Sequence, residues 1–126
     1  MCCRGADASR EVLDLLAEVA AALSAGNAGL FLKAFDPAMA GFAKLREQVT
    51  GLVAQGALES VIDPEEDEGD GRRRVVRVDW TLRVQRGVVA ANYSSREQVV
   101  TFTVEKQGRR WRIVAMEPSG FFAPAE

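Results

Sequence analysis

The hydrophobic pattern of this chain changes its period once, near Gly56. Before that point, apolar residues recur every three or four positions, a spacing typical of helices that bury one face. The first such run, over residues 9–24, predicts a helix. Its apolar positions are Val12, Leu15, Leu16, Val19 and Leu23. Gly26 predicts the end of this helix, and Asn27 is a good N-cap for a short second helix.

A third helix is expected to begin at Asp36-Pro37, because Asp caps helices and Pro is tolerated in the first turn. We expect this helix to end near Gly56. Its apolar stripe consists of Phe42, Leu45, Val49, Leu52 and Val53.

After Gly56, apolar and polar residues alternate, which predicts strands with one buried face. Residues 58–63 predict a short strand, and residues 63–71 a polar, turn-rich connection. The second strand has an apolar face made of Val76, Val78, Trp80, Leu82 and Val84. Residues 87–95 are expected to form a loop. The last two strands, joined by a hairpin at Gln107-Gly108, bury Val100, Phe102, Val104, Trp111, Ile113 and Ala115.

These elements predict one α+β domain over residues 1–126, in which residues 1–8 form a terminus without regular structure. About three N-terminal helices pack on a curved four-stranded antiparallel sheet. Such a sheet buries one face by bending around the helices, and a chain of 126 residues has room for one core.

Charge argues against one class of partner. The formal net charge is −2, and the basic run Arg72-Arg73-Arg74 closely follows the acidic run Glu65-Glu66-Asp67-Glu68. Nucleic-acid binding requires a face of one sign, so we expect no nucleic-acid partner. No stretch approaches the roughly 20 apolar residues of a membrane span, so we also expect no transmembrane segment.

Metal and cofactor sites are not expected either. The chain has no histidine, and its only cysteines are Cys2 and Cys3. A structural zinc site needs about four ligands. The acidic residues 63–70 do not fit a calcium loop, because Glu68 holds the glycine position and Arg74 the last ligand position.

The motif Met1-Cys2-Cys3 leaves two compartments open. A cysteine that follows a removed leader is typical of exported lipoproteins. The same residues equally fit the start of a cytoplasmic protein.

The order of elements resembles the nuclear transport factor 2-like (NTF2-like) superfamily, from about residue 9 to residue 124. The motifs that carry the resemblance are Gly26-Asn27, Phe35-Asp36-Pro37, Trp111-Arg112-Ile113, Pro118 and Phe121-Phe122. The resemblance implies a cone, also called a cystatin-like fold, with a pocket open at one end. The superfamily includes ketosteroid isomerase, scytalone dehydratase, SnoaL-like polyketide cyclases and many non-catalytic binding or dimerisation domains. Function must therefore be argued from the pocket.

One alternative is a small isomerase or dehydratase that acts on a hydrophobic substrate. The resemblance places Asp36 near the general base of the isomerase. The partners of that base are missing, however. The predicted first helix has no tyrosine, the sole tyrosine, Tyr93, falls in a predicted loop, and the dehydratase histidines have no counterpart. A capping role explains Asp36 more simply.

Aromatic residues are the candidates for an apolar ligand pocket. They are Phe31, Phe35, Phe42, Trp80, Phe102, Trp111, Phe121 and Phe122. Such a pocket suits a nonpolar small molecule, with polar contacts from Ser60, Arg74 or Ser119 at its rim. In the alternative interpretation these residues are core, and Phe121 and Phe122 fold back to fill the space.

We therefore predict a non-catalytic small-molecule-binding or protein-interaction domain. The outward positions of the last two strands form a modestly apolar patch of Val99, Thr101, Thr103, Val114 and Met116. A back-to-back homodimer through the outer sheet face would bury this patch.

Overall fold

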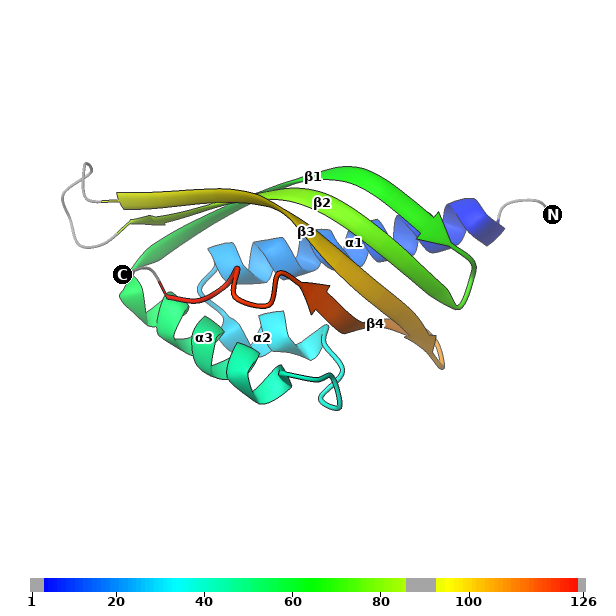
Figure 1. Ribbon diagram of the computed structural model, residues 1–126, viewed down its shortest axis with the longest axis horizontal. Helices are drawn as coiled ribbons and strands as arrows, with labels where there is room; N and C mark the ends of the chain where they lie inside the picture. Colours follow the sequence, from blue (N-terminus) through cyan, green and yellow to red (C-terminus); the bar gives the residue numbers. More distant parts are fainter. Residues whose placement is uncertain (1–3, 86–92, 125–126) are drawn as a thin grey trace.

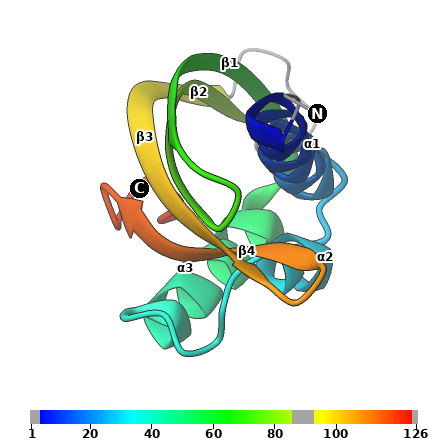
Figure 2. The ribbon, with the colours of Figure 1, turned by 90° about the vertical axis from the view of Figure 1, so that its right-hand side faces the viewer.

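Three helices and one antiparallel sheet make up the computed structural model, which describes residues 4–85 and 93–124. The helices are α1 (Arg4–Ser24), α2 (Ala28–Lys33) and α3 (Phe42–Gln55). The strands are β1 (Ala57–Gly69), β2 (Arg73–Gln85), β3 (Tyr93–Gln107) and β4 (Arg110–Glu117), and they lie in the sheet in this order (Figure 1). The sheet curves around the helices (Figure 2). The predicted α+β fold class is confirmed.

The first two helices begin and end largely as the sequence predicts. Gly26 has a left-handed φ of 72° after α1, and the Asn27 side chain accepts a hydrogen bond of 3.0 Å from the Leu30 N–H. The start of α1 was predicted wrongly, since residues 4–8 are helical. Ala8 is buried in the core, so α1 continues toward the N-terminus beyond the predicted start.

The predicted start of the third helix is wrong as well. α3 begins at Phe42 after Gly41, whose φ is 82°. A tertiary contact explains the delay. The Ile113 N–H donates to the Ala34 carbonyl (2.9 Å), and the Asp36 N–H donates to the Ile113 carbonyl (2.8 Å). These bonds pair Phe35 with Ile113 of β4 as an isolated parallel bridge, so the chain turns before it can become helical.

Two of the strands are longer than the sequence predicts. β1 continues through the acidic residues to Gly69, where we expected a loop. A bulge between Pro64 and Glu66 accommodates the proline, which is tolerated in an edge strand. β3 starts at Tyr93, so residues 93–95 are paired with β2 rather than in a loop. The rest of that predicted loop, residues 87–92, lies outside the described residues.

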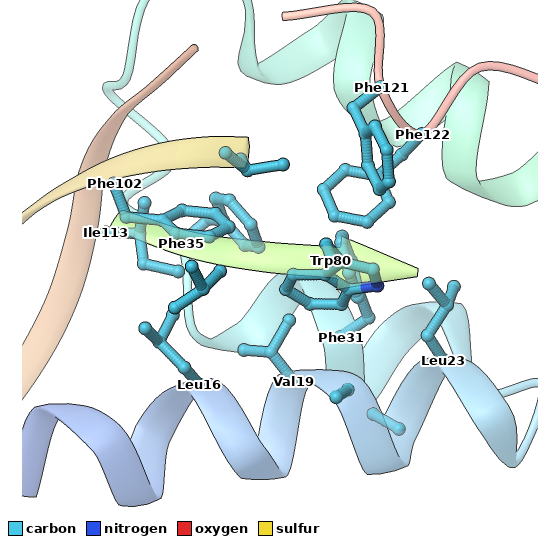
Figure 3. Packing of buried hydrophobic residues seen from close by; sticks show 14 of the residues in the cluster. Leu16, Val19, Leu23, Phe31, Phe35, Trp80, Phe102, Ile113, Phe121 and Phe122 are labelled. Atoms are coloured by element: carbon cyan, nitrogen blue, oxygen red, sulfur yellow. The ribbon is translucent and has the colours of Figure 1, made fainter. Parts of the chain in front are cut away.

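The core lies between the concave face of the sheet and the helices (Figure 3). The spacing of the buried residues in α1, namely Val12, Leu16, Val19 and Leu23, is helical as predicted. Every second residue of β2 from Val76 to Val84 is buried. None of the described helices is long and apolar enough to cross a membrane.

Candidate functional site

Asp36 lies at the surface, in the turn between α2 and α3. Its carboxylate accepts a hydrogen bond of 2.9 Å from the Ala38 N–H and one of 2.7 Å from the Gln107 side-chain amide. These hydrogen bonds, the Ala38 bond first, lower the pKa of Asp36 below its usual range. A general base needs a pKa near the working pH. Asp36 is therefore arranged as the anchor of a turn.

The predicted pocket aromatics gather mainly in the core. Phe31, Phe35, Trp80, Phe102 and Phe122 are each at most 1% exposed, so their rings fill the interior against one another (Figure 3). Trp80 lies 5.9 Å from Phe102 between ring centroids, and Phe31 lies 5.2 Å from Phe35. Phe42, at the start of α3, is partly buried against this core.

The C-terminal segment, residues 118–124, brings two of these aromatics into the interior. The ring of Phe122 lies edge-on at 5.0 Å from Phe31 and at 5.0 Å from Trp80. Phe121 contacts Phe122 at 5.1 Å and Trp80 at 6.4 Å. In Figure 3 both side chains reach from the tail toward Trp80. We call residues 118–124 the tail.

The tail is held by Arg96, a residue that the sequence analysis did not single out. The Arg96 guanidinium donates to the Phe121 carbonyl (2.6 Å) and to the Ala123 carbonyl (2.8 Å). Partial burial lowers the pKa of Arg96. Arg96 lies opposite Leu82 in the sheet and so faces the helices. The alternation of Val100, Phe102 and Val104, extended back to residue 96, predicts this inward position.

Three buried polar side-chain atoms have no hydrogen-bond partner among the described residues. They are the Trp80 Nε1, the Ser60 Oγ and the Gln48 Oε1. A buried polar atom without a partner is uncommon and costs roughly 1–3 kcal/mol. Two of the predicted rim residues lie in different places. Ser60 pairs with Leu82 in the sheet and so lies on the inner face, whereas Ser119 is exposed in the tail.

Arg74, the third predicted rim residue, takes part in a structural ion pair instead. Its Nε lies 2.7 Å from the Asp67 Oδ1, and the Asp67 carboxylate also accepts a hydrogen bond from the Ser9 hydroxyl of α1. Only 8% of the Arg74 side chain is exposed. The Arg74–Asp67 pair joins the β1–β2 hairpin to α1.

A groove of about 860 Å³, which the hydrophobic pattern does not predict, lies between α1, α2 and the start of β4. Of the eight predicted aromatics, only Trp111 lines the groove. Its indole N–H donates to Glu11 at 2.8 Å. The groove lies along a face of α1 other than the one that carries the predicted apolar stripe. On that face, the acidic residues at positions 11, 14 and 18 are the feature of the sequence that indicates a site.

The outer sheet face carries exposed valines at Val61 (57%), Val75 (38%) and Val99 (42%). Met116, which we expected on this face, packs against the core instead. A shift in register between Thr103 and Val104 interrupts the alternation of β4. On the same outer face, Asp79 forms a hydrogen bond with Glu97, and this bond, followed by charge repulsion, raises the pKa of Glu97.

Comparison with known proteins shows the fold. No protein-family model matches the chain, and no curated protein sequence is similar to it. A protein of unknown function from Mycobacterium tuberculosis has a TM-score of 0.71 at 16% identity, over 84% of this chain and 67% of that protein. A protein of unknown function with a cystatin-like fold from Nostoc punctiforme has a TM-score of 0.67 at 14% identity, over 86% of each chain.

An NTF2-like protein of unknown function from Shewanella oneidensis has a TM-score of 0.63 at 14% identity, over 86% of this chain and 95% of that protein. The predicted resemblance is therefore confirmed for the fold: the chain has the NTF2-like, cystatin-like architecture. Because all these identities are low, they leave the function to be argued from the site.

Proposed function

We propose that this chain is a non-catalytic domain that binds a nonpolar small molecule in the space that Phe121 and Phe122 fill. The observation that carries the proposal is the way the tail is held. No helix or strand of the described chain includes the tail, and a single arginine donates to two of its carbonyl oxygens. Its two aromatic rings occupy the interior as a bound apolar ligand would.

Two further features support a ligand at this place. Arg96 brings a charged donor to the inner face, and both of its hydrogen bonds go to carbonyl oxygens of the tail, so the tail is held by two polar contacts that one side chain makes. The Trp80 indole N–H lies buried beside the tail and has no hydrogen-bond partner in the part of the chain that the structure describes. A ligand with an apolar body and one acceptor atom would satisfy this donor.

A catalytic role for Asp36, the alternative that the sequence left open, has less support. The carboxylate is occupied by two hydrogen bonds and has a lowered pKa. Proton transfer at neutral pH is favoured by the opposite shift. A solved structure with this fold, a candidate scytalone dehydratase from Novosphingobium aromaticivorans, has a TM-score of 0.71 at 10% identity, over 86% of this chain and 80% of that protein. This likeness concerns the fold.

Arg96→Met will increase the affinity for a neutral apolar probe, N-phenyl-1-naphthylamine, by about tenfold. The substitution removes two hydrogen bonds that close the tail, so a larger fraction of the molecules is open to the probe. Probe fluorescence measures the dissociation constant and the stoichiometry. Arg77→Met, at a half-exposed arginine of β2, is the matched control and leaves the affinity unchanged. Equal weak binding by the wild type, both variants and a denatured sample would mean that the interior is only core.

We also propose that the outer sheet face forms a homodimer. The helices cover the opposite face only (Figure 2), and the exposed valines come from β1, β2 and β3. One charged pair on this face, Arg77–Glu66 at 3.0 Å, is neutral within the chain. A second copy can therefore cover the valines beside it without stranding those two charges.

Val99→Lys will convert the dimer to a monomer, because it places two like charges in a desolvated, isologous interface. Sedimentation velocity measures the change. Leu30→Lys, which adds the same charge at an exposed position of α2, leaves the dimer intact. A monomeric wild type at a concentration of about 100 µM would exclude a stable dimer.

A further inference from the structure

The groove between α1, α2 and β4 has walls of opposite charge. Asp14 and Glu18 of α1 line one side. Arg109 and Arg110, from the β3–β4 hairpin and the start of β4, line the other side together with Lys33 of α2. All of these side chains are exposed. The floor is apolar and includes Leu15, Val19 and Trp111.

No ion pair joins the two walls within the described parts of the chain, although they face one groove. Glu11 is the exception among the acids, because it bonds to Trp111 at 2.8 Å and pairs with Lys106 at 3.3 Å. The remaining walls are separated by more than the 4 Å at which a salt bridge forms. An occupant that carries both charges would neutralise both walls at once.

The lining of the groove changes from charged to apolar along its length. The Glu11–Trp111 hydrogen bond fixes its charged end beside the β3–β4 hairpin. Toward the other end, where α1 passes into α2, the lining consists of Ala21, Ala22, Ala25 and Leu30, the last of which is 52% exposed. An elongated molecule can thus place its polar group at the hairpin and its apolar chain along the alanines. A volume of about 860 Å³ suits a small molecule of this kind.

We infer that this groove is a binding site for a single-chain zwitterionic amphiphile. The anionic group of the ligand lies at Arg109 and Arg110, where arginine forks bind phosphate or carboxylate oxygens. The cationic group lies at Asp14 and Glu18, and the alkyl chain covers Leu15 and Leu30. This site is separate from the space under the tail and does not depend on the function proposed for it.

The test compares three probes that share a ten-carbon chain, each below its micelle concentration: decylphosphocholine, decanoate and decyltrimethylammonium. Isothermal titration of the full chain will show decylphosphocholine binding about tenfold more tightly than either singly charged probe. A second readout comes from Trp80→Phe, which leaves Trp111 as the only tryptophan. Decylphosphocholine will shift its emission, because Trp111 lies in the floor.

Charge reversal on each wall will change the preference in opposite directions. Asp14→Lys will weaken decylphosphocholine about tenfold and strengthen decanoate, while Arg110→Glu will weaken decylphosphocholine and strengthen decyltrimethylammonium. The control variants Glu47→Lys and Arg46→Glu change exposed charges of α3 outside the groove and leave all three affinities unchanged. Equal affinities for the three probes, absence of binding, or insensitivity to both reversals would overturn the inference.

Discussion

Replacing Phe122 with alanine will lower the free energy of unfolding by about 3–5 kcal/mol. Phe122 is fully buried, and its ring lies 5.0 Å from both Phe31 and Trp80. Removing the ring forfeits its burial and leaves a cavity against fixed aromatic neighbours, which pack too tightly to close over it. Urea denaturation followed by circular dichroism measures the loss.

Two further variants serve as controls for Phe122→Ala. Phe122→Leu keeps much of the volume and will cost less than half as much, while Ser119→Ala, at an exposed position of the tail, will cost almost nothing. A loss below about 1 kcal/mol for Phe122→Ala would contradict the packing described here, because it would mean that the tail does not belong to the core.

Phe122→Ala also tests whether the tail is simply part of the core or occupies the site of a ligand. If a nonpolar ligand takes the place of Phe122, saturating N-phenyl-1-naphthylamine will stabilise Phe122→Ala more than the wild type, because ligands that bind only the native state add to its stability. A core without a ligand site predicts no stabilisation of the wild type, because stabilisation of Phe122→Ala alone also follows when the probe fills the cavity that the substitution leaves. Stability and binding are thus measured on one variant.

Periodicity predicted the helices and most of the sheet because these elements depend on local spacing. In α1 the positions 12, 16, 19 and 23 face one direction whatever packs against them. The errors occur where distant contacts decide the local structure. The hydrogen bonds between residues 34–36 and Ile113 delay α3, and partners in β2 turn an acidic segment into a strand.

The sequence predicts which aromatic strand residues point into the interior, but it does not predict whether the rings of Phe121 and Phe122 join them there. Alternation places Trp80 and Phe102 on the inner face, yet nothing local says whether Phe121 and Phe122 point inward or into solvent. Their position depends on Arg96, which lies 25 residues from Phe121 in sequence. The groove is harder still to predict, because three separate elements form its walls.

The acidic segment of β1 leads to the second large effect, at the pair Arg74–Asp67. The two side chains are 8% and 16% exposed, and their atoms Nε and Oδ1 lie 2.7 Å apart. Arg74 also donates to the Asp70 carbonyl at 3.1 Å, and Asp67 accepts a hydrogen bond from Ser9. The pair is therefore nearly desolvated and connects both strands of the hairpin to α1.

Arg74→Met will lower the free energy of unfolding by about 3 kcal/mol, because it leaves the Asp67 carboxylate in a nearly buried place without its counter-charge. Arg77→Met is the matched control. It breaks the Arg77–Glu66 pair, whose side chains are 52% and 54% exposed, and will cost less than about 1 kcal/mol. Chemical denaturation of the two variants under one buffer condition gives the comparison.

The double variant Asp67→Leu/Arg74→Met tests whether the stability lost in Arg74→Met comes from leaving the Asp67 charge desolvated. With both charges removed, no ion is left desolvated, so most of the stability lost in Arg74→Met will return. The cycle of single and double variants then yields a coupling energy of at least about 2 kcal/mol between positions 67 and 74. If the double variant loses as much stability as the two single variants together, positions 67 and 74 are not coupled, and each side chain stabilises the fold through its own packing. In that case the ion pair does not explain why the strand β1 continues to Gly69.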